Sequence, residues 1–153
     1  MPFVRAHWHT IGPFHRKLWN NVAKRLLILH ALILELPEDY FLPLHEYDVP
    51  SEDFIRWMIN YPRSRAQHEA VEPYNIGGHA DFSSLTMLFE QNVLGLQMLS
   101  RDGEWLWVKP IPGGITINAG ESLQHLTKGI SLSVRGVDGR VCEGDDSSCP
   151  RTA

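Results

Sequence analysis

The chain is poor in cysteine. Its two cysteines, Cys142 and Cys149, both lie near the C-terminus. They form neither a C-x-x-C pair nor a disulfide framework. The fold is therefore not expected to depend on disulfide bridges, and a cytoplasmic setting is our expectation.

Long apolar runs and an excess of basic charge are also missing. The longest apolar stretch, residues 26–36, is interrupted by His30 and Glu35 and is too short to span a bilayer. No secretory signal pattern opens the chain. The formal net charge is −4 and the sequence pI is about 6.0, without the basic footprint of a nucleic-acid-binding protein. We therefore expect no membrane partner and no nucleic-acid partner.

The first part of the sequence predicts helix. The chain has 153 residues, enough for one domain, and 43% of them are hydrophobic. Residues 1–13 show no period and are predicted to form an irregular lead-in. From Phe14 onward apolar residues recur at spacings of about three and four, which predicts a long helix that Pro37 ends. The segment Pro37–Asp39 suits the first turn of a short second helix.

The period then changes to that of β-strands. Residues 55–61 alternate between apolar and polar and predict a half-buried strand closed by Pro62. Short strands are predicted at residues 85–89, 94–99, 105–108 and 115–118. Turn signals, Arg101–Gly103 and Pro112–Gly114, separate the later strands. Such a series predicts an antiparallel sandwich or barrel.

One short motif suggests metal chemistry. In "NIGGHADFSS" His79 and Asp81 stand two residues apart, just before an apolar run. At a strand end such residues point to the same side, where an imidazole and a carboxylate can occupy adjacent coordination positions. With one more histidine they would form the facial triad of non-heme Fe(II) oxygenases. An isolated His-x-Asp pair is also common by chance, so a polar turn is the alternative.

The surrounding motifs resemble the isopenicillin N synthase-like family of Fe(II)- and 2-oxoglutarate-dependent oxygenases. The resemblance covers about Phe14 to Gly129. It is carried by "LELPEDYF", "RWMINYP", "GGHADFSSLTMLFEQNVLGLQML" and "DGEWLWVKPIPGGITINAGESLQHLTKG", in the family's order. The resemblance implies an α+β fold, a long N-terminal helix followed by a double-stranded β-helix (jelly roll), which here would be incomplete.

The resemblance also implies roles for particular residues. His79 and Asp81 match the first two iron ligands. Tyr61 lies where some family members contact the carboxylate of the co-substrate, and a core tyrosine in a strand is the alternative. Asn118 is interpreted as a turn residue at a strand end. Gly77 and Gly78 are expected to permit the backbone shape before the ligand pair.

The end of the family pattern is missing. Alignment on Thr127 and Gly129 places Gly136 where the family has its second ligating histidine. The later Arg-x-Ser pair, which clamps the far carboxylate of 2-oxoglutarate, has no counterpart. His125, on a predicted strand, is the nearest substitute by position. Residues 130–153 are predicted to be a divergent, disordered tail, which suggests a truncated or misspliced product.

Two functions follow from these patterns. The resemblance implies a dioxygenase, an oxidoreductase that uses Fe(II) and 2-oxoglutarate to oxidise a small-molecule substrate, here impaired. The alternative is a non-catalytic, truncated jelly-roll domain with weak or no metal binding, favoured by the missing histidine. A carbohydrate-binding jelly roll is a third possibility, because exposed tryptophans can stack on sugars, but the order of motifs argues against it.

Overall fold

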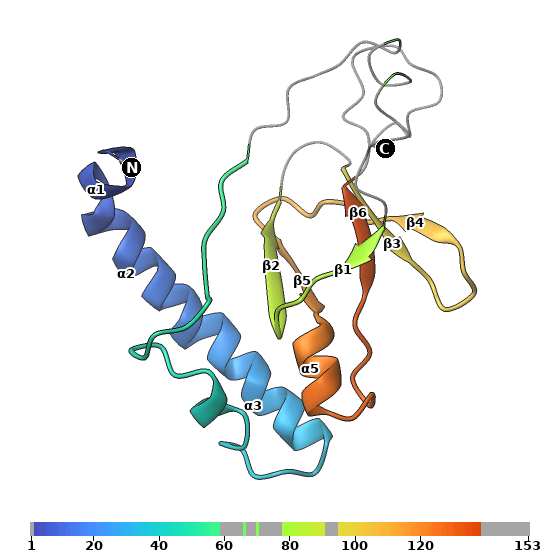
Figure 1. Cartoon of the computed structure of the whole chain (residues 1–153), viewed down its shortest axis with the longest axis horizontal. Helices are drawn as coiled ribbons and strands as arrows, with labels where there is room; N and C mark the ends of the chain where they lie inside the picture. Colours follow the sequence, from blue (N-terminus) through green and yellow to red (C-terminus); the bar gives the residue numbers. More distant parts are fainter. Residues whose placement is uncertain (1, 59–65, 67–69, 71–77, 91–94, 139–153) are drawn as a thin grey trace. The chain divides into compact units, whose positions relative to one another are not determined.

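The computed structural model describes residues 2–58, 66, 70, 78–90 and 95–138. The chain divides into two compact units, Met1–Met58 and Ile59–Ala153. The described part of the first unit is helical, whereas that of the second is mainly β-strand (Figure 1). The fold is therefore of the α+β class, as predicted.

The first unit is built on a nearly continuous helical run. Its segments are α1 (Pro2–Ala6), α2 (Trp8–Leu18), the π-helix η1 (Trp19–Ala23) and α3 (Lys24–Ile33). The prediction of an irregular lead-in over residues 1–13 is wrong, because helix begins at Pro2. Neither α1 nor α2 contains a buried residue, so this part of the helical run packs no side chain into the core of the described structure.

The helical run ends close to the predicted stop. α3 finishes at Ile33, and Glu35 then adopts a positive φ of 57°. The N–H of Leu36 donates to the carbonyl of Ala31 at 2.9 Å, which satisfies one of the carbonyls at the helix end. The second helix predicted from Pro37 is wrong, because a turn and the 3-10 helix η2 (Leu42–Leu44) follow instead.

A short apolar face is the buried part of the first unit. Ala23, Leu27 and Ala31 are buried and recur every four residues, so they share one side of the helix. Phe41, in the turn before η2, is fully buried as well. α3 contacts η2, so the chain folds back on its helix after residue 36.

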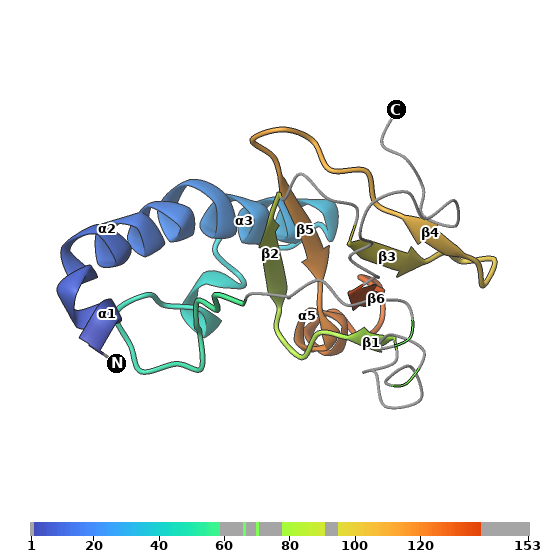
Figure 2. The same cartoon turned by 90° about the horizontal axis from the view of Figure 1, so that it is seen from above.

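The described part of the second unit forms two antiparallel sheets (Figure 2). The four-stranded sheet has the order β1-β6-β3-β4, and β2 pairs with β5 in the other. The strands are β1 (His79–Ala80), β2 (Leu85–Phe89), β3 (Leu96–Leu99), β4 (Trp105–Trp107), β5 (Ile115–Ala119) and β6 (Arg135–Asp138).

The strands predicted for residues 85–118 are confirmed within two residues at each end. The predicted strand at 55–61 is not observed at residues 55–58, and its remainder lies outside the described residues. The predicted strand around His125 is wrong, because α5 (Glu121–Leu126) occupies this place. Only Leu123 and Thr127 are buried there, a helical spacing of four.

The disordered tail predicted for residues 130–153 is wrong in its first part. Arg135–Asp138 form β6, which lies between β1 and β3 in the sheet. The remainder of the predicted tail, 139–153, lies outside the described residues. The sequence missed β6 because it is short and carries no apolar alternation of its own.

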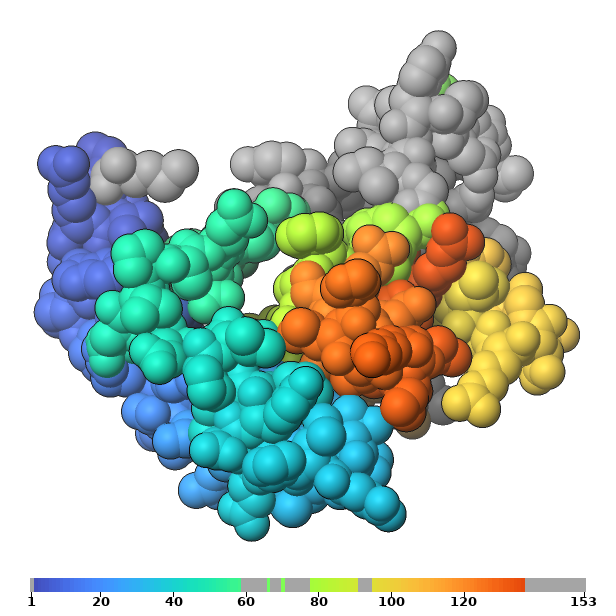
Figure 3. Space-filling view, turned by 60° about the horizontal axis from the view of Figure 1, so that its bottom comes forward, coloured from blue at the N-terminus to red at the C-terminus, as the bar shows by residue number. Residues whose placement is uncertain are grey.

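A backbone junction joins the loop after β1 to the start of α5. The N–H groups of Gly120, Glu121 and Ser122 donate to the carbonyls of Ser84, Asp81 and Phe82, at 3.1, 2.8 and 3.2 Å. In Figure 3 the orange atoms around α5 lie against the lime atoms that follow β1. The junction fixes the backbone of Asp81, one of the candidate ligands.

Gly120 makes this close approach possible. A Cβ atom there would lie 2.0 Å from the carbonyl oxygen of Ser83 and 2.6 Å from that of Asp81. Both are backbone atoms, so the overlap cannot be relieved by rotating a side chain. Any larger residue must push the loop and the helix apart.

We therefore expect Gly120→Ala to lower the free energy of unfolding by about 3 kcal/mol, the upper range for overpacking. Urea denaturation followed by tryptophan fluorescence measures this change. Gly136→Ala is the matched control, since its Cβ would stand 3.5 Å from Leu96 Cδ1, an ordinary contact. Equal stability of Gly120→Ala and the unsubstituted chain would contradict the junction.

Candidate metal centre

His79 and Asp81 lie side by side at the end of β1, as the i, i+2 spacing predicts. The Nε2 atom of His79 is 3.8 Å from Oδ1 of Asp81, close enough for an ion pair when the imidazole is protonated. Their side chains are 56% and 35% exposed, so solutes can reach both. A neutral imidazole and a carboxylate this close can bind one divalent metal ion together.

Asn118 orients the carboxylate of the pair. Its Nδ2 donates to Oδ2 of Asp81 at 3.0 Å, which leaves Oδ1 as the oxygen nearer His79. Asn118 belongs to β5 and stands opposite Thr86 of β2, so the smaller sheet supplies this contact. Hydrogen bonds of this kind hold ligating carboxylates in place at metal sites. Sequence reasoning treated Asn118 as a turn residue and missed this role.

Gly78 allows close packing just before His79. A Cβ atom at Gly78 would lie 2.2 Å from Cη2 of Trp105, so the indole ring occupies the space that a side chain would need. The structure thus shows a need for space at Gly78, and no positive φ angle of the kind that the predicted backbone shape would require. Gly77 lies outside the described residues.

Gly136 stands directly opposite His79 in the pairing of β1 with β6. Directly opposed residues of an antiparallel pair project their side chains to the same face of the sheet. The sequence alignment placed the family's second histidine at residue 136, and the strand register puts this residue beside His79. Glycine has no side chain and cannot serve as a ligand.

The donor set therefore does not complete a three-ligand iron site. Among the residues that the structure describes, no group of three or more His, Cys, Asp or Glu side chains is placed to hold a metal ion. His125, the substitute considered from the sequence, is exposed on α5 and belongs to no such group. Tyr61, the candidate contact for the co-substrate, lies outside the described residues.

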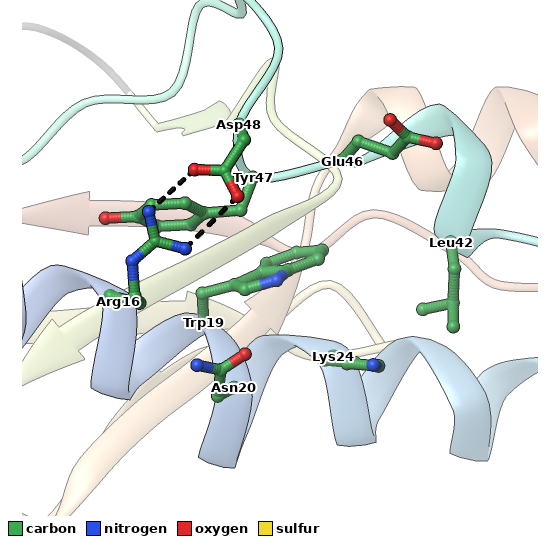
Figure 4. Close-up of a pocket in the computed structure, with 8 residues that line it drawn as sticks. All are labelled: Arg16, Trp19, Asn20, Lys24, Leu42, Glu46, Tyr47 and Asp48. Carbon is green, nitrogen blue, oxygen red and sulfur yellow. Dashed lines mark hydrogen bonds and ion pairs between the residues drawn. The ribbon is translucent and has the colours of Figure 1, made fainter.

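A separate pocket of about 290 Å³ lies within the first unit (Figure 4). The Arg16 guanidinium lies over the Tyr47 ring, 4.2 Å from its centroid, and Tyr47 Oη is 3.0 Å from His15 Nδ1. The pocket is lined by Arg16, Trp19, Asn20, Lys24, Leu42, Glu46, Tyr47 and Asp48. It contains neither His79 nor Asp81.

Two of the charged side chains that line this pocket form an ion pair. Arg16 donates two hydrogen bonds to the Asp48 carboxylate, at 2.6 and 3.2 Å, and so ties α2 to the segment after η2. Hydrogen bonding to Arg16 lowers the pKa of Asp48 below its ordinary value, and the same bond raises the pKa of Arg16. This arrangement fastens two chain segments together.

Comparison with known proteins agrees with this geometry. The model of the 2OG-Fe(II) oxygenase superfamily matches residues 42–148, more than half of the chain. The chain belongs to this superfamily, and the resemblance to the isopenicillin N synthase-like oxygenases is confirmed.

Two curated relatives show how much of a whole protein is present. The 2-oxoglutarate-Fe(II) type oxidoreductase hxnY of Emericella nidulans is 34% identical over 107 residues, which cover 69% of this chain and 30% of that protein. The 1-aminocyclopropane-1-carboxylate oxidase of Dictyostelium mucoroides is 27% identical over 156 residues, 85% of this chain and 41% of the relative. The chain thus spans less than half the length of either relative.

Solved structures support the fold. A 2OG-Fe(II) oxygenase family protein from Caulobacter crescentus superposes with a TM-score of 0.67 at 24% identity, over 91% of this chain and 42% of that one. This likeness extends over both the helical and the β-rich parts of the sequence. Within the described ranges, no helix is both long enough and apolar enough to cross a membrane.

The paired charges of the pocket give a pH prediction. Because Arg16 lowers the pKa of Asp48, the stabilisation is complete above the ordinary carboxyl pKa and is lost as pH falls through the lowered value. In Arg16→Gln we expect the carboxyl of Asp48 to titrate at higher pH than in the unsubstituted chain, measured by NMR. Arg25→Gln removes a charge about 13 Å farther along the helix and serves as the control. Identical Asp48 titration in Arg16→Gln and the unsubstituted chain would disprove the pairing.

Proposed function

We propose that this chain is part of a dioxygenase, an Fe(II)- and 2-oxoglutarate-dependent oxidoreductase that acts on a small molecule. His79 and Asp81 are its metal ligands, and Asn118 positions the carboxylate. The observation that carries the proposal is the His79–Asp81 pair, 3.8 Å apart at a strand end, in a chain of this superfamily. Iron supplies the oxidative chemistry when bound, and the protein supplies ligands and orientation.

The proposal extends to the fold and the setting. We propose that the two sheets form an incomplete double-stranded β-helix (jelly roll). Tyr61 remains a predicted contact for the 2-oxoglutarate carboxylate. A cytoplasmic location also remains a prediction.

Metal binding tests the ligand pair. We expect the chain to bind Fe(II) under anaerobic conditions, measured by competition with a coloured chelator. His79→Ala and Asp81→Ala should each weaken binding by at least about 10-fold, since loss of a ligand costs more than loss of a supporting contact. His125→Ala and Asp102→Ala remove the same side chains at exposed positions outside the pair and should leave the affinity unchanged. Equal affinity in all four variants would rule out the pair as the binding site.

A non-catalytic domain is the second candidate, and one observation favours it. Gly136 occupies the place opposite His79 and cannot ligate. Two protein ligands hold a metal ion more weakly than three. Succinate formation from 2-oxoglutarate in air separates the candidates: turnover that depends on His79 and Asp81 supports the oxidoreductase, and metal binding without turnover supports the non-catalytic domain.

Asn118 provides a further prediction. Asn118→Ala should weaken metal binding by about 10-fold, because the Asp81 carboxylate loses the bond that orients it. Thr116→Ala, two residues earlier on the same face of β5, is the matched control. An unchanged metal affinity in Asn118→Ala would exclude this positioning role.

A further inference from the structure

We propose that the pocket of the first unit binds a free aromatic amino acid in its zwitterionic form. Lys24 binds the carboxylate of this ligand, Glu46 binds its ammonium group, and Trp19 packs against its ring. The inference goes beyond the proposed function and does not depend on it, because the pocket contains neither His79 nor Asp81.

Two opposite charges in this pocket are left without a partner. Lys24 belongs to α3, Glu46 follows η2, and both side chains line the pocket. Figure 4 shows them on opposite sides of it. Among the side chains that the structure describes, neither has an ion-pairing or hydrogen-bonding partner, whereas Arg16 and Asp48 pair with each other. A ligand that carries one charge of each sign complements both.

Apolar side chains supply a surface for a ring. Trp19 and Leu42 line the same pocket, and both are half-buried. The Tyr47 ring lies 6.4 Å from the Trp19 ring, tilted by 38°, and the Arg16 guanidinium covers one of its faces. The indole of Trp19 is therefore the aromatic surface that we assign to the ligand, since offset or tilted ring pairs are favourable.

Contacts within the protein hold the two walls of the pocket together. Arg16 donates two hydrogen bonds to Asp48, at 2.6 and 3.2 Å, and Tyr47 Oη lies 3.0 Å from His15 Nδ1. These bonds join α2 to the segment that carries Glu46. A site that is formed before the ligand arrives loses less entropy when the ligand binds.

The size of the pocket selects a small ligand. Its volume of about 290 Å³ is near the lower end of the roughly 300–1,000 Å³ that is typical of small-molecule sites. Asn20 lines the pocket four residues before Lys24 and offers an amide donor to the same carboxylate. A single ring attached to an α-amino acid group matches this size and these polar groups.

An NMR titration of the full chain with L-phenylalanine tests the site. The indole N–H signal of Trp19, assigned with Trp19→Phe, should shift saturably. Phenylacetate lacks the ammonium group and phenethylammonium lacks the carboxylate, so each should bind at least about 10-fold more weakly, the loss of one charge-assisted contact. Glycine lacks the ring and should give no saturable shift at the same concentration.

Two variants test which charge each side chain recognises. Glu46→Gln should bind L-phenylalanine and phenylacetate equally, because the ammonium group no longer contributes. Lys24→Gln should bind L-phenylalanine and phenethylammonium equally, because the carboxylate no longer contributes. Glu38→Gln and Lys17→Gln are the matched controls, since they remove exposed charges of the same unit that do not line the pocket, and they should keep both preferences.

The outcomes separate this inference from the proposed function. Absence of a saturable Trp19 shift with L-phenylalanine would overturn the inference, and so would equal binding of either single-charge ligand by the unsubstituted chain. If a glutamine variant does not fold, the preferences of the unsubstituted chain decide alone. His79→Ala should leave amino-acid binding unchanged, so failure of the metal centre does not affect this result.

Discussion

Because β1 and β6 pair antiparallel, whatever side chain residue 136 carries must begin beside His79. The proposed metal centre depends on this constraint. His79 and Asp81 are brought together by their own spacing, but two donors leave the coordination of a metal ion open. The residue that could supply a third donor beside His79 belongs to β6, more than fifty positions later in the chain. In this sequence that residue is glycine, which offers no side chain to a metal ion.

The second constraint is the junction that holds the loop between β1 and β2. Three consecutive N–H groups at the start of α5 bind carbonyls of this loop, and Asn118 binds the Asp81 side chain from β5. The smaller sheet and α5 thus fix both the backbone and the carboxylate of Asp81, while β6 lies beside His79. Each proposed ligand is positioned by a different part of the second unit, so the proposed centre depends on the fold and not only on the His-x-Asp motif.

The sequence predicted what depends on neighbouring residues. His79 and Asp81 share one side because an i, i+2 spacing at a strand end requires it, and the strands from Leu85 to Asn118 are visible in their apolar patterns. Prediction from the sequence failed where the deciding contact joins residues that are far apart in the chain. The role of Asn118 comes from the pairing of β5 with β2 and from its bond to Asp81. α1 and the start of α2 bury no side chain. Leu123 and Thr127 are buried at the helical spacing of four, and this spacing was interpreted as strand alternation.

A disulfide cross-link tests most directly whether residue 136 faces His79. Opposed residues in an antiparallel pair have Cα atoms about 4.5–5.5 Å apart, within the range that a disulfide bridges. With Cys142 and Cys149 replaced by serine, His79→Cys combined with Gly136→Cys should oxidise readily to an intramolecular bridge, detected by mass spectrometry. His79→Cys combined with Arg135→Cys should not, because the two side chains point to opposite faces. Faster bridging of the residue 135 pair than of the residue 136 pair would contradict the register, and with it the placement of residue 136 beside His79.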